Sequence, residues 1–268
     1  MKSEFVKQIK EKLSQNIDQL KKQYREGHTG TKTKFFILDN LIDDKSVKSI
    51  YKQFDGDYWL LKDTFREKKL TYAKLDNLNP ILSDITEAFH DKEIVELVSQ
   101  ITGINDLEYD PSLYAGGISK MRKGHFLNPH IDNSHDGGRK RYRRLNLLFY
   151  VAPGLEEKHG GNFELWDDKV KYPVKIPAKF NRLVVMETGD HTWHSVDKVK
   201  TDLSRCCVSN YYFSESSPRK FEYYHVTSFN GRPNEPLKRM YSSMDNFLRY
   251  SFVKLTGYSR GKEKARKV

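Results

Sequence analysis

Apolar residues near the start of the chain recur at every third or fourth position, which is the spacing of an amphipathic helix. The stripe consists of Phe5, Ile9, Leu13, Ile17, Leu20 and Tyr24. It predicts one helix that ends near Gly27 and Gly30 and packs its apolar face on the rest of the protein. A short β-rich run at 35–38 follows. Three more helical patterns come after it, at 47–54, 81–89 and 92–101.

From about residue 112 the pattern changes to short apolar runs separated by Gly, Pro and Asn or Asp. The runs expected to be strands are 117–122, 145–151, 162–166, 174–176, 182–187 and 206–213. Many short strands with turns between them favour a β-sandwich or barrel. After Pro236 the spacing is helical again, with Leu237, Met240, Tyr241, Met244, Phe247 and Leu248. We therefore expect an N-terminal amphipathic helix (1–30), a central domain (31–215) in which helices precede the strands, and a basic helical C-terminal extension (216–268).

The composition excludes several classes of protein. The chain has 268 residues with 16 Tyr and 15 Phe, which is too aromatic for a mainly disordered polymer. No apolar run approaches the length of a membrane-spanning helix, and the N-terminus lacks the apolar stretch of a secretory signal. The two cysteines, Cys206 and Cys207, are adjacent and cannot form a disulfide scaffold. A reducing, cytoplasmic location fits these features best.

The positive charge is concentrated at the two ends. The formal net charge is +11. Residues 1–30 hold seven Lys and Arg against four Asp and Glu, a net of +3, and residues 254–268 hold six against one, a net of +5. A nucleic-acid-binding domain more often carries basic residues throughout its fold, interleaved with aromatic ones. We therefore interpret the ends as solvated, with contact to nucleic acid or an anionic surface as the less favoured alternative.

Candidate metal ligands lie in the strand-rich half. His130 and Asp132 are two positions apart, so both side chains would point to the same face of a strand. His194 follows far downstream as a third ligand. Two histidines and one carboxylate form the facial triad of non-haem Fe(II) oxygenases, which leaves other coordination positions open. Arg205 opens a predicted strand, and a guanidinium inside a sheet needs an anion, such as a carboxylate of a bound dicarboxylate.

Each of these residues alone has an ordinary structural explanation. A lone His-x-Asp is typical of a surface turn, and a single histidine or arginine usually packs in the core or lies on the surface. The order, the spacing and the strand context together favour a metal site. His191 is the rival to His194 as the third ligand. We expect His191, His125, His135 and His159 to have supporting, loop or solvent-exposed roles.

Five segments and one arginine carry a resemblance to a known family. They are His130–Asp132, Arg144–Tyr150, Gly160–Trp166, Asn181–Met186, His194–Val196 and Arg205. Together they resemble the Fe(II)- and 2-oxoglutarate-dependent dioxygenase superfamily, within its prolyl 4-hydroxylase-like branch. The resemblance implies a mainly β fold with flanking helices, whose core is a double-stranded β-helix or jelly roll. It also implies an enzyme that hydroxylates an unactivated C–H bond of a peptidyl or small-molecule substrate and releases succinate and CO2.

The same resemblance assigns roles to individual residues. His130, Asp132 and His194 would bind Fe(II), and no catalytic residue is expected beyond these ligands. Arg205 would pair with the distal carboxylate of 2-oxoglutarate, which reacts together with O2. Ascorbate is an auxiliary reductant that the resemblance adds to this set.

Two departures from the family pattern concern the co-substrate. The family often has a Tyr about nine residues before the first histidine, where this chain has Met121. The co-substrate would then contact Asn146 or Tyr150 on the next strand. Many members carry Lys in place of Arg205, and the arginine keeps the charge. The pair Gly160–Gly161 fits a close backbone approach and is expected to be architectural.

The basic run Arg139–Arg144 lies just past the metal-binding turn and holds five cations in six residues. We expect it near the mouth of the active site, where Arg139 and Arg141 would bind an acidic or phosphorylated substrate. A solvated hairpin is the alternative. Peptidyl proline, a free amino acid, a sugar or nucleotide intermediate and an alkylated nucleic acid remain open as substrates. Relatives that repair alkylated nucleic acid carry a second Arg six residues after the first, and Tyr211 in that position argues against them.

Two other classes of function stay open. A cupin-like jelly roll would use a metal for non-oxygenase chemistry, but such sites tend to contain more histidines and have no need of Arg205. A catalytically silent, dioxygenase-like binding module is the other class. Such modules usually lose a metal ligand, whereas the candidate triad is complete here.

Overall fold

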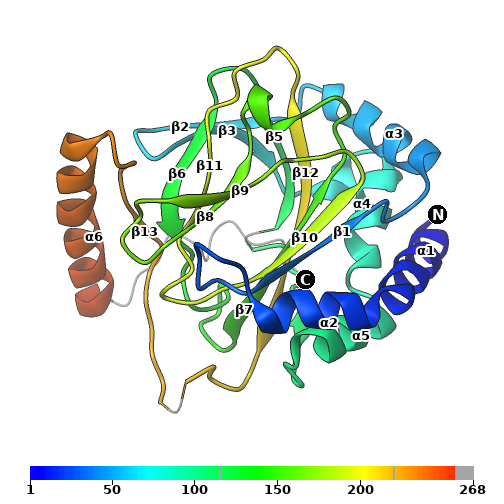
Figure 1. Ribbon diagram of the computed structural model, residues 1–268, viewed down its shortest axis with the longest axis horizontal. Coiled ribbons are helices and arrows are strands. Elements are labelled where there is room, and N and C mark those ends of the chain that lie inside the picture. Colours follow the sequence, from blue (N-terminus) through cyan, green and yellow to red (C-terminus); the bar gives the residue numbers. More distant parts are fainter. Residues whose placement is uncertain (115, 220, 257–268) are drawn as a thin grey trace.

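Helices cover one side of a rolled β-sheet, and one long helix lies at the opposite edge of the molecule (Figure 1). The computed structural model describes residues 1–114, 116–219 and 221–256. The helices are α1 (Lys2–Gln15), α2 (Ile17–Glu26), α3 (Asp44–Lys52), α4 (Pro80–Ala88), α5 (Lys92–Thr102) and α6 (Pro236–Thr256). Asp43, Asn79 and Asp91 cap the starts of α3, α4 and α5 through their side chains, and Gly103 ends α5 in the left-handed conformation. The predicted helices between residues 47 and 101 are confirmed.

The strands form one curved antiparallel sheet. They are β1 (Phe35–Asp39), β2 (Leu60–Asp63), β3 (Glu67–Tyr72), β4 (Glu108–Tyr109), β5 (Gly117–Met121), β6 (Phe126–Ile131), β7 (Tyr142–Tyr150), β8 (Phe163–Trp166), β9 (Pro173–Ile176), β10 (Arg182–Glu187), β11 (His194–Val196), β12 (Arg205–Ser214) and β13 (Ser228–Phe229). The main path runs β1-β10-β7-β12-β5-β3-β6-β11-β8-β9. Strands β10 and β12 both pair with β7, all three are mostly buried, and their side chains build the core with the flanking helices. This architecture confirms the predicted jelly roll.

The predicted N-terminal helix is two helices, which corrects the expectation of a single one. Asn16 lies between α1 and α2, and its side-chain amide donates to the carbonyl of Lys12. Asparagine competes in this way with the backbone ladder and favours helix ends. The apolar stripe is nevertheless buried from Phe5 to Tyr24, and both helices pack on the central domain, α1 on α4 and α5, and α2 on α5 and β1. The stripe therefore packs on the domain, as predicted, while the three-part division of the chain stays a prediction.

One hairpin was not foreseen from the sequence pattern. β2 and β3 pair with each other, and β3 inserts between β5 and β6 in the sheet. The hairpin sequence is mixed, and Leu60 and Leu61 stay exposed. Its effect is to close the sheet over the region where β6 carries His130.

The chain after β12 leads through β13 to α6. β13 pairs with β6, and α6 contacts β13. The helix predicted after Pro236 is confirmed. Most of the predicted basic end, residues 257–268, lies outside the described residues. Within the part of the chain that is described, no helix has the length and apolar character needed to cross a membrane.

Candidate metal centre and co-substrate pocket

Two short neighbouring strands bring together residues that are far apart in the sequence. β6 and β11 pair antiparallel, with His130 directly opposite His194. Asp132 comes immediately after β6 ends at Ile131. One ligand atom from each of the three side chains lies within 4.8 Å of the other two. The structure thus brings the predicted triad together at the end of one strand pair.

Both imidazoles are buried and neutral. Burial lowers the pKa of His130 to about 3, and it also lowers the pKa of His194. Nδ1 of His130 lies 3.0 Å from the carbonyl oxygen of Asn128, and Nδ1 of His194 lies 2.9 Å from that of Thr192. A carbonyl oxygen only accepts, so each Nδ1 carries the proton. Each Nε2 is therefore left as an unprotonated atom that can bind a metal.

Asp132 is the ionised member of the triad. Burial is the largest single effect and favours its protonated form, but the electrostatic attractions at the site, of which that of the Arg143 guanidinium is the largest, together outweigh it and hold the pKa of Asp132 well below its usual range. Arg143 Nη1 lies 3.1 Å from Asp132 Oδ2, and Oδ2 accepts no hydrogen bond from the described residues. The carboxylate lies 3.7 Å from His130 Nε2 and 3.8 Å from His194 Nε2. A buried, ionised carboxylate facing two unprotonated imidazole nitrogens is a donor set that suits Fe(II).

Arg143 is the residue of this site that sequence reasoning missed. It is fully buried, and its guanidinium lies over the ring of Tyr211 at 4.4 Å. A β-bulge places it there, because β12 advances by one residue while β7 advances by two, from Arg143 to Leu145. The bulge reverses the side-chain alternation, so Arg143 lines the same cavity as Asn146.

A second cation, Arg205, is buried without an acidic partner among the described residues. Its exposed fraction is 4%. Nη2 donates to the hydroxyl of Tyr150 at 3.1 Å, and Nη1 lies 3.7 Å from Sδ of Met121. Nε of Arg205 and Oδ1 of Asn146 are buried and have no partner in the described residues. Because a buried charge without a counterion is costly, this pocket suits an anionic ligand.

One cavity of about 850 Å³ joins the two halves of the site. The triad, Arg143, Asn146 and Arg205 all line it, and Tyr150 borders it through its hydrogen bond to Arg205. Asn146 lines the cavity and Tyr150 contacts Arg205, while their role in binding the co-substrate stays a prediction. Met121 also faces Arg205, directly opposite it in the register of β5 and β12.

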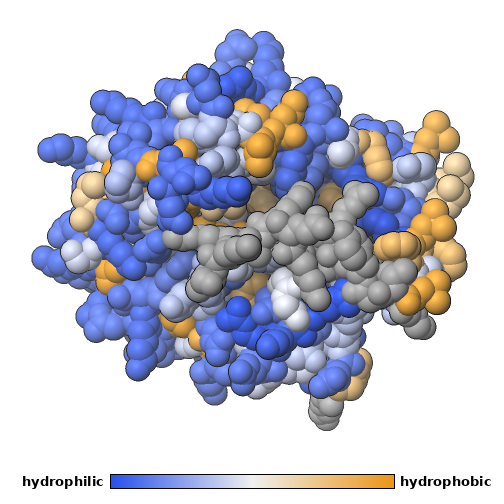
Figure 2. Space-filling model, turned by 180° about the vertical axis from the view of Figure 1, so that it is seen from behind, coloured by the Kyte–Doolittle hydropathy of each residue, from blue (hydrophilic) through white to orange (hydrophobic). Residues whose placement is uncertain are grey.

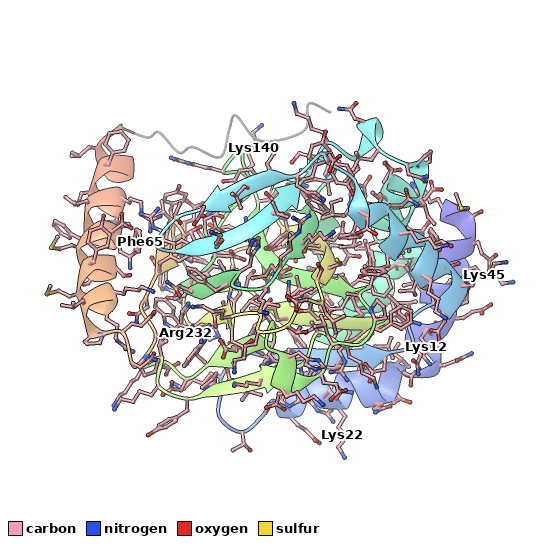
Figure 3. The ribbon with its side chains drawn as sticks, turned by 90° about the horizontal axis from the view of Figure 1, so that it is seen from above. Lys12, Lys22, Lys45, Phe65, Lys140 and Arg232 are labelled. Atoms are coloured by element: carbon pink, nitrogen blue, oxygen red, sulfur yellow. The ribbon has the colours of Figure 1, made fainter. Side chains whose placement is uncertain are left out.

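A buried polar network fixes the strand that carries His194. The hydroxyl of Ser195 donates to Glu164 at 2.6 Å and accepts from Trp166 Nε1 at 2.8 Å. Arg232, labelled in Figure 3 on the segment before α6, forms an ion pair with Glu164 at 2.8 Å. The network ties β8 and β11 to the C-terminal part of the chain, which limits the movement of His194.

The other candidate histidines lie away from the triad. Nε2 of His191, the predicted rival, lies 3.3 Å from Glu187, and this contact raises the pKa of His191. His125, His135 and His159 do not line the cavity. Within the described residues, His130, Asp132 and His194 are the group whose potential ligand atoms lie close enough together to hold one metal ion.

Arg139 and Arg141 do not line the cavity either. Arg141 forms ion pairs with Asp136 and Glu108 at 3.1 and 3.0 Å. Arg139 stacks on the ring of Tyr224 at 4.6 Å. Their role in binding a substrate stays a prediction, and the cation of the basic run that reaches the cavity is Arg143.

The glycine pair is architectural, as expected. A Cβ atom on Gly160 would lie 2.1 Å from the backbone oxygen of Lys198, and one on Gly161 would lie 3.4 Å from Cδ of Arg205. Both glycines have positive φ, at 68° and 73°. They allow the loop before β8 to pack against the Arg205 pocket.

Residues 116–213 match the family model of the 2OG-Fe(II) oxygenase superfamily. These residues form a 2OG-Fe(II) oxygenase domain. The domain contains the triad and Arg205, and the match confirms the predicted family and class of enzyme. No curated protein sequence matches the chain.

Solved structures with the same fold include three prolyl hydroxylases. One from Trichoplax adhaerens, in complex with a peptide fragment of the oxygen degradation domain of hypoxia inducible factor, has 16% identity and a TM-score of 0.54 over 76% of this chain and 92% of its own. One from Pseudomonas putida has 12% identity and a TM-score of 0.54 over 76% and 100%. One from Phytophthora capsici has 18% identity and a TM-score of 0.53 over 95% and 78%. At such identities the likeness shows the shared fold.

Iron and 2-oxoglutarate are the groups that the family requires, and the residues present fit both. The ionised carboxylate of Asp132 and the two unprotonated Nε2 atoms suit Fe(II). The Arg205 guanidinium, which has no acidic partner among the described residues and whose Nε has no hydrogen-bond partner there, suits a carboxylate.

Proposed function

We propose that the chain is a hydroxylase whose iron is held by His130, Asp132 and His194 and whose 2-oxoglutarate is held by Arg205. The observation that supports this most strongly is that one cavity contains both a metal donor set and a buried guanidinium that has no acidic partner among the described residues. When bound, iron and 2-oxoglutarate supply the activation of O2 that places a hydroxyl group on a C–H bond, with succinate and CO2 as co-products.

The residues around the co-substrate bind it and orient it. Arg205 can donate two parallel hydrogen bonds to a carboxylate. The Tyr150 hydroxyl accepts from Arg205, and because burial raises the pKa of Tyr150, it stays protonated and can donate to the same carboxylate. Asn146 adds a side-chain amide to the wall between Arg205 and the triad.

The triad carries a carboxylate, and this favours hydroxylation. Halogenating relatives lack the carboxylate, so that a halide can bind the metal in its place. In this chain Arg143 helps to keep Asp132 ionised. At neutral pH the carboxylate would therefore occupy the coordination position that a halide takes in the halogenating relatives.

The primary substrate enters between the hairpin β2–β3 and β13. Leu60 and Leu61 line the cavity there, and Phe229 lines it on the other side. This apolar rim accepts a peptide or a small molecule. Because a structural neighbour is a complex with a peptide, proline-containing peptides are the first class to test.

The binding of 2-oxoglutarate tests the proposal without a known substrate. Calorimetry on the Mn(II)-loaded protein should show tight binding that falls at least about 100-fold in Arg205→Met, because a charge-assisted bidentate contact is lost. Arg182→Met is the matched control, since Arg182 pairs with Asp39 outside the cavity. Equal affinities in the two variants would remove Arg205 from the co-substrate site.

Product formation then identifies the reaction. Peptide and metabolite pools should raise succinate release above the rate without substrate, and the stimulating compound should gain 16 mass units, the mass of one oxygen atom. Stimulated succinate release with an unoxidised product would contradict hydroxylation.

A further inference from the structure

Helix α6 turns its polar face toward the protein and its apolar face toward solvent. The exposed face carries Leu237, Met240, Tyr241, Met244, Phe247, Leu248, Phe252 and Leu255, while Tyr250, also exposed, lies on another side of the helix. Phe247 is 71% exposed and Leu255 is 85% exposed. Figure 2 shows orange, hydrophobic side chains gathered in patches along the edge of the molecule where α6 lies. This is the reverse of the usual orientation of a helix on the surface of a protein.

Polar contacts hold α6 in this orientation. Asp245 forms an ion pair with Arg66 of the β2–β3 turn. The side chain of Asn246 accepts from the backbone N–H of Phe229 at 3.0 Å and donates to its carbonyl at 2.7 Å. Arg239 donates to two carbonyls of the loop before β9. Rotating α6 to bury its apolar face would break all of these contacts.

The apolar face is continuous and wide. At about 100° per residue, its side chains cover an arc of roughly 140° along the whole helix. A two-stranded coiled coil uses a narrower seam flanked by charged residues. Here the flanking positions carry Tyr241, Phe247 and Phe252. A face this wide fits the interior of a lipid bilayer better than it fits a single partner helix.

The sequence that follows α6 is strongly basic. Residues 257–268 contain five Lys and Arg and one Glu, a net charge of +4. An exposed apolar helix next to such a cluster is the combination that binds anionic membrane surfaces. The same charge, in a protein of net +11, would oppose the approach of a second copy.

We propose that α6 is an interfacial helix that docks the enzyme on the surface of an anionic lipid bilayer. The apolar face inserts among the acyl chains, and the positive charge of the protein attracts it to the anionic surface. The helix lies parallel to the membrane, since its other face is bound to the protein. The proposal does not depend on the identity of the substrate.

Vesicle sedimentation with the full chain tests this directly. The probes are vesicles of phosphatidylcholine and vesicles of phosphatidylcholine with about 25% phosphatidylserine. We expect binding to the anionic vesicles, at least about tenfold weaker binding to the neutral ones, and a further decrease at high salt. The double substitution F247S/L248S and the double substitution K264E/R266E should each weaken binding at least about tenfold.

Tyr172→Ser is the matched control, because Tyr172 is 74% exposed but lies outside α6. It should bind as the unsubstituted protein does. The thermal midpoint and 2-oxoglutarate affinity of F247S/L248S should stay unchanged, which separates lipid binding from folding. Absence of vesicle binding by the folded protein, or full binding by F247S/L248S, would overturn the proposal. A dimer in the ultracentrifuge that F247S/L248S converts to a monomer, without vesicle binding, would overturn it in favour of a second copy.

Discussion

Arg143 forms a buried ion pair with Asp132, with 3.1 Å between Nη1 and Oδ2. The pair has two consequences for the proposed iron site. It keeps the carboxylate ionised in a buried environment, and it fixes the direction in which the carboxylate faces the two imidazoles. Arg143 therefore acts on the metal through a ligand, as a positioning residue.

Replacing Arg143 by Met should weaken iron binding. The substitution keeps much of the volume but leaves the carboxylate of Asp132 without a counterion, so its charged form is destabilised. We expect the anaerobic Fe(II) affinity to fall at least about tenfold, while Arg143→Lys retains part of it. Fluorescence titration with Fe(II) or Mn(II) measures this.

Arg144→Met is the control for that substitution. Arg144 is the adjacent bulge residue and donates to the hydroxyl of Ser214. Its loss should leave metal affinity unchanged. If Arg143→Met and Arg144→Met behave alike, the ion pair has no role in metal binding.

The glycine pair before β8 gives a prediction about stability. In Gly160→Ala the new methyl group meets the backbone oxygen of Lys198, and a backbone atom cannot move away at low cost. We expect a loss of about 2 kcal/mol or more in the free energy of unfolding, beyond the cost of the positive φ itself. Urea denaturation gives the value.

Gly124→Ala separates the two costs. Gly124 also has a positive φ, of 83°, but a Cβ there would have nothing within 4 Å. This variant should lose only the conformational part, about 1 kcal/mol. Equal losses in the two variants would show that the loop moves to accept the methyl group.

The lowered pKa of Glu67 gives a prediction about how the free energy of unfolding depends on pH. Burial opposes ionisation, but Lys69 and Lys62 outweigh it and lower the pKa of Glu67 to about 2. A carboxylate with a depressed pKa stabilises the folded state above its unfolded pKa of about 4.5. That stability is lost as the pH falls from about 4.5 toward 2.

In Glu67→Gln this contribution is absent. The free energy of unfolding should then fall less steeply with decreasing pH, by roughly 1–3 kcal/mol over the window. Glu96→Gln is the control, since Glu96 forms an exposed pair with Lys92 that contributes little. Parallel pH profiles for Glu67→Gln and the unsubstituted protein would contradict the assignment.

The sequence was sufficient for the parts of the site that depend on local spacing. His130 and Asp132 are close in the chain, whereas the strand pattern around His194 and Arg205 indicated only a sandwich or barrel, and the resemblance to the family implied the jelly roll that brings all four together. Arg143 was not predictable, because it belongs to a run of five cations, and only the register of β7 on β12 selects the one that enters the cavity.

The other differences between the sequence-based predictions and the structure also come from tertiary contacts. The periodicity of residues 5–24 continues through Asn16, so the helix break there depends on a side-chain hydrogen bond that the pattern does not contain. The α6 pattern predicted a helix correctly, but not the direction of its apolar face. That direction is set by Arg66 and Phe229, which are distant in sequence.

The central claim is that one cavity binds iron through the triad and 2-oxoglutarate through Arg205. Adding Fe(II) and 2-oxoglutarate to the apo-protein without oxygen should produce a visible metal-to-ligand charge-transfer band. His194→Ala and Arg205→Met should each remove or greatly weaken the band, while His191→Ala should leave it unchanged. A folded, iron-loaded protein that gives no band would contradict this account. A band that persists in His194→Ala but is lost in His191→Ala would contradict it as well.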